Sequence, residues 1–220
     1  GRAGGGGGAT AAPADAHILV FSSMGKLVRQ IGKPGQTDAS IPANLDRPAD
    51  VAVDVAANEV YVADGGTHQR VVVLDATSGA FKRQWAGHGA AFLRLSSIAL
   101  SKDGQVYVGD RKGNKVQVFK KDGTFVSEFA VAPTSLGNGS VWDVALSSDA
   151  AQQYLMVADG QNENVLLFDR KTLKQLSMFG TGGRWPGRFY AINSLAMDAR
   201  GNVYTGEAYE GKRVQKFLPQ

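Results

Sequence analysis

The amino-acid sequence predicts an all-β fold, a β-propeller built from four-stranded antiparallel blades. Three observations indicate this fold. A cassette of four short apolar elements recurs along the chain with a period of about 45 to 50 residues, a range typical of propellers and solenoids. The elements are rich in Val, Ile, Leu, Phe and Tyr, which favour strands. Gly, Asp, Asn and Ser separate them, and no window carries the apolar stripe of a capped helix, so we expect little or no helix.

The first two elements of the cassette predict the inner hairpin of each unit. The second element reads VYVADGG from Val60, VYVGDRK from Val106, LMVADGQ from Leu155 and VYTGEAY from Val203. The first element lies about ten residues earlier and is followed by a polar turn. Its copies are DVAV from Asp50, SIAL from Ser97, DVAL from Asp143 and SLAM from Ser194.

The third and fourth elements predict the outer hairpin. The third alternates apolar and polar residues, which is typical of a strand with one half-exposed face. Its copies are RVVVLD from Arg70, KVQVFK from Lys115, NVLLFD from Asn164 and RVQKFL from Arg213, with an extra leading copy, HILVF, from His17. The fourth element follows at a constant distance and is centred on Ile31, Trp85, Phe129 and Phe179. Turns such as KDG from Lys121 place Gly where a tight hairpin needs a positive φ.

The subtype of the repeat follows from what the cassette contains. At the matching positions the units lack the Gly-His and Trp-Asp pairs of WD repeats and the diglycine pattern of kelch repeats. Instead, RPADVAVDVAANEVYVADGGTHQRVVVLD and INSLAMDARGNVYTGEAYEGKRVQKF closely resemble the NHL repeat family. The resemblance covers residues 17–218 and implies a six-bladed ring as the typical form. It implies less about function, because NHL propellers serve as enzymes, RNA binders and protein-binding platforms.

The strand count predicts an incomplete ring. Two strands precede Pro48, three sets of four follow, and the last unit stops after its third strand. We expect a flexible Gly/Ala-rich segment at residues 1–16 and the propeller at 17–220. The propeller would hold a partial blade at 17–33, full blades at 48–87, 95–131 and 141–180, and a partial blade at 192–218. The alternative is a smaller ring, in which the strand from Leu27 to Gly32 closes the last blade.

Composition narrows the class of protein only slightly. The chain is 43% hydrophobic and 20% charged, which is ordinary for a globular protein. No apolar run reaches the roughly 18 residues of a membrane span, so we expect none. The absence of cysteine excludes disulfides and thiolate chemistry. The compartment stays open. The stretch ATAAPADA is faintly similar to the end of a secretory cleavage site and leans toward a secreted or periplasmic protein.

A net charge of +4 raises the question of nucleic-acid binding. In a propeller, the loops joining strands 2 and 3 share one face with those joining strand 4 to the next strand 1; we call this the loop face. On it basic residues alternate with acidic ones, as Arg47 does with Asp46 and Arg111 with Asp110. A mixed surface does not form a stripe for phosphates, which argues against nucleic acid. Binding of single-stranded RNA is the lesser alternative.

The loop face is also where we expect a ligand, because the first strands converge there on the axis and loops escape the packing demands of the strands. The candidate ligand-binding residues are Arg94, Trp142, Arg188, Tyr190 and Asn193 from the 4-to-1 loops and His68 from a 2-to-3 loop. Aromatic rings with Arg and Asn at a concave mouth suit a protein, a peptide or a small polar ligand. For Trp142 and Tyr190 the alternative is packing between blades.

One acidic residue recurs in every unit just after the second strand, as Asp64, Asp110, Asp159 and Glu207. A residue that every blade requires is better explained by turn capping or a local ion pair than by one catalytic site. We therefore expect a structural role for these four carboxylates.

Catalytic and metal-binding patterns are weak, and we assign no catalytic residue, metal or cofactor. His17, His68 and His88 lack the spacing of metal ligands. The segment from Arg47 to Phe129 is similar in order and spacing to the propeller of the peptidyl-hydroxyglycine amidating lyases, which bind zinc through histidines. The resemblance places Ser96 and Asn193 at histidine positions and Gly66 at a tyrosine position, so the nitrogen ligands of zinc are missing.

The sequence therefore favours a non-catalytic binding or scaffolding module with its ligand on the loop face. The alternative is a propeller lyase or hydrolase whose metal ligands lie partly in missing blades.

Overall fold

A computed structural model describes residues 15–219 of the chain. Within this range it contains seventeen strands and no helix, which confirms the predicted all-β fold. No helix of the described part is therefore long and apolar enough to cross a membrane.

Three four-stranded blades form the middle of the chain. The first blade contains β3 (Pro48–Asp54), β4 (Glu59–Asp64), β5 (Arg70–Asp75) and β6 (Phe81–Trp85). The second contains β7 (Leu95–Leu100), β8 (Gln105–Asp110), β9 (Lys115–Lys120) and β10 (Phe125–Ala130). The third contains β11 (Val141–Leu146), β12 (Tyr154–Asp159), β13 (Asn164–Asp169) and β14 (Gln175–Phe179). Each blade is an antiparallel meander in chain order, as the constant offsets between the sequence elements predicted.

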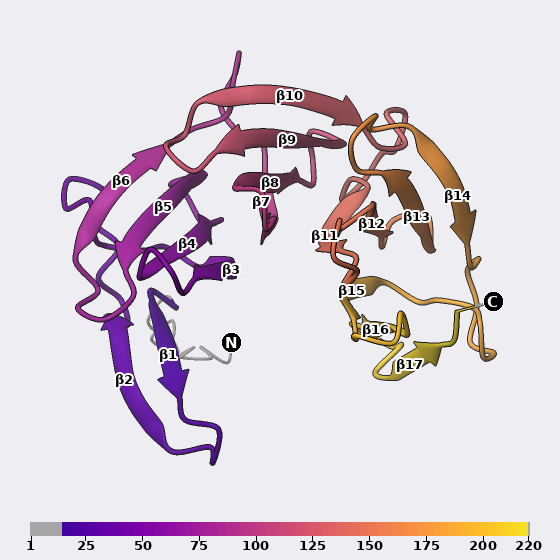
Figure 1. The fold of residues 1–220 in the computed structure, drawn as a ribbon, viewed down its shortest axis with the longest axis horizontal. Helices are drawn as coiled ribbons and strands as arrows, with labels where there is room; N and C mark the ends of the chain where they lie inside the picture. The colour runs from indigo at the N-terminus through magenta and orange to yellow at the C-terminus, as the bar shows by residue number, and fades with distance from the viewer. Residues whose placement is uncertain (1–14, 220) are drawn as a thin grey trace, which may run out of the picture.

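Two smaller sheets flank the blades. The leading sheet pairs β1 (His17–Phe21) with β2 (Leu27–Gly32), and the last sheet orders β15 (Ile192–Met197), β16 (Val203–Glu207) and β17 (Val214–Phe217). Figure 1 shows the five sheets as an open arc with β3, β7, β11 and β15 on the inside and β6, β10 and β14 on the outside. Since β2 pairs with β1 and not with β17, the alternative of a smaller closed ring is wrong.

The core is divided into four clusters, one at each junction between neighbouring sheets. The junction of the first and second blades holds Tyr61, Phe92 and Phe119, and that of the second and third holds Tyr107, Leu155 and Phe168. Smaller clusters join the leading sheet to the first blade and the third blade to the last sheet. Each sheet therefore buries its apolar faces only against its sequence neighbours, as in other repeat proteins.

The inner strands are also tied to one another by side chains. Asp50 of β3 accepts a hydrogen bond from the backbone N–H of Ile98 at 2.9 Å, and Asp143 of β11 accepts one from Leu195 at 2.6 Å. Between these two junctions, Ser96 Oγ donates to the carbonyl oxygen of Val141 at 2.7 Å. This series of bonds fixes how far each inner strand is displaced along its neighbour.

The beginning of the described chain is packed. The carbonyl oxygen of Asp15 accepts a hydrogen bond from the backbone N–H of Arg47 at 2.7 Å, and Ala16 is buried. The predicted flexible segment at 1–16 thus includes two residues that lie against the first blade, while residues 1–14 are outside the described part.

Candidate functional site

A cavity of about 330 Å³ lies where the first strands of four sheets converge, and we call it the axial cavity. Its lining comes from β3, β7, β11 and β15 and from two loops of the loop face. The residues are Ala49, Asp50, Arg94, Leu95, Ser96, Arg111, Trp142, Asp143, Asn193 and Ser194. The first and last of these residues, Ala49 and Ser194, are nearly 150 residues apart in sequence, which corresponds to about three blade repeats. The fold thus brings distant segments together in one site.

Arg111 and Trp142 form one part of the cavity wall. The guanidinium carbon of Arg111 lies 3.2 Å from the centroid of the Trp142 ring, as in a cation–π contact. Arg111 Nε donates to the carbonyl oxygen of Asn138 at 2.9 Å, and the indole N–H of Trp142 donates to that of Gly139 at 2.8 Å. Both side chains are buried, so their orientation is fixed before any ligand arrives.

Gly160 makes room for the indole ring. A Cβ atom at this position would lie 2.5 Å from Cδ2 of Trp142 and would also collide with the carbonyl oxygen of Ile192. Tyr209 and the indole ring meet in a T-shaped arrangement, with ring centroids 6.3 Å apart. The glycine after the second strand of the third blade is therefore part of the construction of the site.

Two carboxylates, Asp50 and Asp143, lie deeper along the inner strands. Each accepts two backbone N–H bonds, one from the following residue and one from the next sheet. The low-dielectric surroundings raise the pKa of Asp50, and they raise that of Asp143 to about 7, with the negative charge of Asp50 adding to the effect. At neutral pH the cavity floor thus carries less negative charge than two free carboxylates would.

The two arginines lie at the opposite end of the cavity, next to the loops. Burial and, to a smaller extent, the positive charge of Arg94 lower the pKa of Arg111 to about 10, while the neighbouring Tyr209 opposes the shift. The backbone N–H of Arg111 donates to the carbonyl oxygen of Arg94 at 2.8 Å, which holds the two residues together. The site therefore has a cationic mouth above an acidic floor.

The structure brings together three of the predicted ligand-binding residues, Arg94, Trp142 and Asn193. Trp142 and Asn193 lie within strands β11 and β15 rather than in the loops before them. Trp142 combines the two roles considered for it, since its ring is buried between sheets and also lines the cavity.

The other predicted residues lie elsewhere. Tyr190 is 37% exposed and donates its backbone N–H to Glu207 at 2.9 Å, while the carbonyl oxygen of Arg188 accepts a hydrogen bond from Gln215 at 2.8 Å. Both belong to the loop that turns over the last sheet. His68 is buried between a carboxylate oxygen of Asp64, at 2.7 Å, and the carbonyl oxygen of Thr37, at 2.9 Å. It joins the segment before β3 to the first blade and is not among the residues that line the axial cavity.

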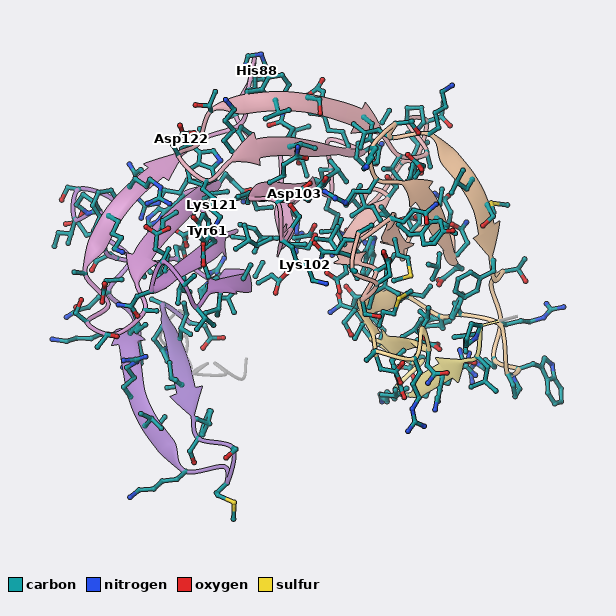
Figure 2. All side chains as sticks on the ribbon, in the orientation of Figure 1. Tyr61, His88, Lys102, Asp103, Lys121 and Asp122 are labelled. Atoms are coloured by element: carbon teal, nitrogen blue, oxygen red, sulfur yellow. The ribbon has the colours of Figure 1, made fainter. Side chains whose placement is uncertain are left out.

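Figure 2 shows His88, another histidine of the loop face, at the outer rim beyond β10. Its ring stacks on Phe125 with centroids 3.7 Å apart, far from the axis.

Ser96 and Asn193, which the expected resemblance to the amidating lyases placed at histidine positions, both line the axial cavity. Ser96 Oγ is already engaged with the carbonyl oxygens of Val141 and Gly109. At the tyrosine position, a side chain on Gly66 would collide with Asp46. The donor set of the cavity is therefore hydroxyl, amide, carboxylate and guanidinium groups, without imidazole.

The recurring acidic residues have the structural role that the sequence predicted. Asp64 accepts the backbone N–H of Asp46 at 2.6 Å, Asp110 that of Arg94 at 2.9 Å and Glu207 that of Tyr190 at 2.9 Å. Asp159 caps its own turn through Gln161 and Asn162. In three sheets this residue fastens the 4-to-1 loop to the end of the second strand, and in the second blade it positions Arg94 directly.

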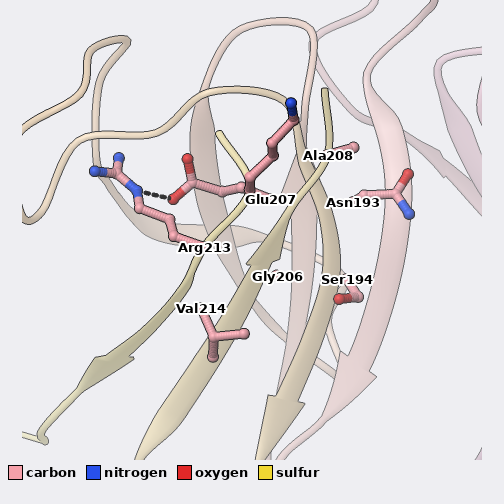
Figure 3. A pocket seen from close by; sticks show the side chains of 8 residues that line it. Asn193, Ser194, Gly206, Glu207, Ala208, Arg213 and Val214 are labelled. Carbon is pink, nitrogen blue, oxygen red and sulfur yellow. Dashed lines mark hydrogen bonds and ion pairs between the residues drawn. The ribbon is translucent and has the colours of Figure 1, made fainter. Parts of the chain in front are cut away.

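A second cavity, of about 410 Å³, lies on the last sheet (Figure 3). Its wall includes Asn193, Glu207 and Val214, and Figure 3 shows Glu207 paired with Arg213, their closest atoms 2.7 Å apart. Val214 is 74% exposed. This face of the last sheet is turned toward the opening of the arc. The cavity is therefore an exposed sheet face and not the entrance to a ligand pocket.

Sequence reasoning missed Arg111, Asp50 and Asp143 as residues of the site. The sequence did contain a signal for the two carboxylates. The first element begins with Asp in the first and third blades, at Asp50 and Asp143, and with Ser in the second blade and the last sheet, at Ser97 and Ser194. For Arg111 the sequence carried no signal beyond its place in a 2-to-3 loop.

The comparisons with known proteins agree with this architecture. The sequence model of the family described as NHL repeat matches residues 45–75 and 92–119, which cover the inner three strands of the first two blades. NHL repeat-containing protein 3 of Homo sapiens is 34% identical over 113 residues, covering 48% of this chain and 31% of that protein. The two matched segments are NHL repeats, and the fold is that of an NHL-type β-propeller. The family suggests a role in protein interaction or scaffolding.

A solved structure, the Kuenenia stuttgartiensis Hydrazine Synthase, shares the fold. The superposition has a TM-score of 0.61 at 12% identity and covers 78% of this chain and 46% of that chain. This likeness concerns the fold alone. The match spans 31% of the length of the human relative.

Proposed function

We propose that this NHL propeller is a non-catalytic binding module whose ligand, a peptide or polar segment of a partner protein, enters the axial cavity from the loop face. The observation that carries the proposal is the convergence of Arg94, Trp142 and Asn193, which come from three different sheets, on one cavity. Concave sites with a few convergent polar groups and a rigid aromatic wall are the usual form of ligand pockets.

The chemistry of the lining supports binding over catalysis. The cavity offers hydrogen-bond donors, acceptors and charges, and its lining contains no histidine, lysine or cysteine. Its two carboxylates, Asp50 and Asp143, already accept hydrogen bonds from backbone N–H groups of the neighbouring sheets. The hydroxyl of Ser96 is held by two backbone carbonyls. We place Arg188 and Tyr190, both exposed, on the outer part of the same contact surface.

The experiment is a selection of displayed peptides on the whole chain, followed by measurement of dissociation constants by fluorescence anisotropy. Peptides bound by the unmodified protein should bind at least about tenfold more weakly to Arg94→Ala and Asn193→Ala, the loss expected for one or two removed hydrogen bonds. Lys26→Ala and Lys171→Ala, exposed cations on the opposite turns, are the controls and should leave affinity unchanged. Peptides that respond only to the two lysine variants would show that the binding face is the wrong one.

The enzymatic alternative is tested separately. Under this proposal the chain does not cleave a hydroxyglycine-extended peptide, because Ser96 and Asn193 stand where the amidating lyases have histidines. Turnover that disappears on chelation of zinc would overturn the non-catalytic assignment.

A further inference from the structure

Arg111 is a buried cation that has no acidic partner among residues 15–219. Three arginines are buried in the described chain, Arg70 and Arg111 at 8% exposed and Arg170 at 6%. Arg70 pairs with Asp64 at 3.1 Å, and Arg170 pairs with Asp103 at 2.9 Å. For Arg111, no Asp or Glu oxygen among residues 15–219 lies within 4 Å of the guanidinium.

A buried charge without a partner is expensive, and proteins almost always pair or hydrogen-bond such groups. Here a second cation, Arg94, lines the same wall, which increases the cost. The two carboxylates of the cavity do not offset it, since Asp50 and Asp143 turn their oxygens toward backbone N–H groups at the sheet junctions. The guanidinium is nevertheless held rigidly, stacked on Trp142 and anchored through Nε to Asn138.

We propose that Arg111 and Arg94 form the receptor for a carboxylate group of the ligand, with Trp142 as the platform that positions Arg111. This inference rests on the proposed binding function and names the chemistry of its ligand. A planar guanidinium matches a carboxylate through two parallel hydrogen bonds, and a rigid one loses little entropy on binding.

The surroundings select a carboxylate over a polyanion. Asp50 and Asp143 line the floor of the same cavity, so a group of higher negative charge or a chain of phosphates would be repelled there. A volume of about 330 Å³ admits a small organic acid or the last residue or two of a peptide. Both sources present the same group, a single terminal carboxylate.

The first experiment follows the side-chain Nε–H signals of arginine and the indole signals of tryptophan by NMR. The uniformly labelled full chain is titrated with sodium N-acetylglycinate at constant ionic strength, with sodium chloride as the reference. The signals of Arg111 and Trp142 should shift in a saturable manner with the carboxylate and not with chloride. Saturable shifts with neither salt, or equal shifts with both, would overturn the proposal.

The second experiment uses matched variants. Arg111→Gln should weaken N-acetylglycinate binding by about tenfold or more, since it removes a charge-assisted pair. Lys112→Gln removes the same charge from the adjacent, exposed position and should leave the affinity within about twofold. If both variants weaken binding equally, the effect is one of net charge and the assignment to Arg111 is wrong.

The two sources are distinguished with peptides obtained in the selection described above, each made with a free and with an amidated C-terminus. A loss of binding on amidation identifies the ligand as a peptide terminus. If N-acetylglycinate binds but amidation has no effect, the carboxylate comes from a small acid. If amidated peptides bind in an Arg94-dependent manner and the acid does not bind, the proposed binding function stands and the carboxylate inference fails.

Discussion

The guanidinium carbon of Arg111 lies 3.2 Å from the ring centroid of Trp142, so that a 2-to-3 loop of the second blade is stacked on the inner strand of the third. Stacking on the indole ring stabilises the orientation of the Arg111 guanidinium. It does not provide a negative charge to offset the cost of burying the cation. The contact therefore makes a rigid site at the expense of stability. A balance of this kind is typical of binding sites, where groups are positioned for a ligand and not for the fold alone.

This balance predicts different outcomes for two equally buried arginines. Arg70→Met should lower the free energy of unfolding by about 3–5 kcal/mol, because it leaves the buried carboxylate of Asp64 without its arginine. Arg111→Met should change it by less than about 1 kcal/mol or raise it, because an unpaired charge is replaced by an apolar side chain. Chemical denaturation of the two variants and the unmodified chain provides the measurement. A loss at Arg111 as large as that at Arg70 would mean that Arg111 serves the fold.

A second prediction concerns the dependence of stability on pH. The pKa of Asp143 rises from its usual 3.8 to about 7 in the folded chain, chiefly through burial. The folded state therefore holds a proton that the unfolded state releases, so this group lowers stability as pH rises from about 4 to about 7. Asp143→Asn keeps an oxygen that can accept the Leu195 N–H and removes the titration. The variant should be more stable than the unmodified chain at pH 8, and its melting temperature should fall less between pH 4 and pH 7.

The control for that comparison is Asp122→Asn. Asp122 lies in the exposed turn before β10, and hydrogen bonds from Thr124 hold its pKa below 3.8, so it does not titrate in the window. Its replacement should leave the slope between pH 4 and pH 7 unchanged. If Asp143→Asn and Asp122→Asn give the same slope as the unmodified chain, Asp143 is already ionised at pH 4.

The fold could be predicted from the sequence because every strand repeats a local pattern. Alternation within each element, glycine at the hairpin turns and a constant offset between elements are local properties, and strands with these properties pair with their neighbours. The structure places the ends of the full blades at Trp85, Ala130 and Phe179, each one or two residues before the predicted limit. The hydrogen bond between Asp15 and Arg47 was missed, since nothing in a Gly/Ala-rich composition indicates a specific hydrogen bond.

The site could be predicted only in part, for a physical reason. Arg94, Trp142 and Asn193 lie at the starts of first strands, and in a propeller these starts converge, so topology alone brings them together. Arg188 and His68 occupy similar loops but do not line the cavity, because Arg188 is exposed and the ring of His68 is held between Asp64 and Thr37. The sequence contains 24 Lys and Arg and 20 Asp and Glu, but it does not show which cations pair with which carboxylates in the fold. The lack of an acidic partner for Arg111 among residues 15–219 can therefore be seen only in the structure.

A third prediction tests the space behind the indole ring. Gly160→Ala should displace Trp142, since the added Cβ would lie 2.5 Å from the ring, and should lower the free energy of unfolding by about 1–3 kcal/mol. It should also weaken carboxylate binding, because Arg111 loses its platform. Gly182→Ala is the matched control, as the nearest atom to its added Cβ is 3.6 Å away and belongs to the flexible side chain of Glu163. Equal stability of the two variants, measured by chemical denaturation, would show that the ring can move without loss.

The last prediction concerns the distribution of stability along the arc. The strands β4, β8 and β12 are buried and paired on both sides, whereas β17 has half of its residues exposed and, within residues 15–219, pairs only with β16. The leading sheet has only two strands, and Phe21 and Leu27 are about half exposed. Because each sheet packs only on its sequence neighbours, the three full blades should unfold as the most stable unit and the two end sheets should open more often.

Hydrogen exchange followed by mass spectrometry should show slow exchange around Val51, Val106 and Leu155 and faster exchange around Leu19 and Val214. The sample must be shown to be monomeric by analytical ultracentrifugation, since association through the unpaired strand edges would protect them. Uniform protection of all five regions in a monomer would mean that the two end sheets are stabilised by contacts with each other and that the arc closes in solution.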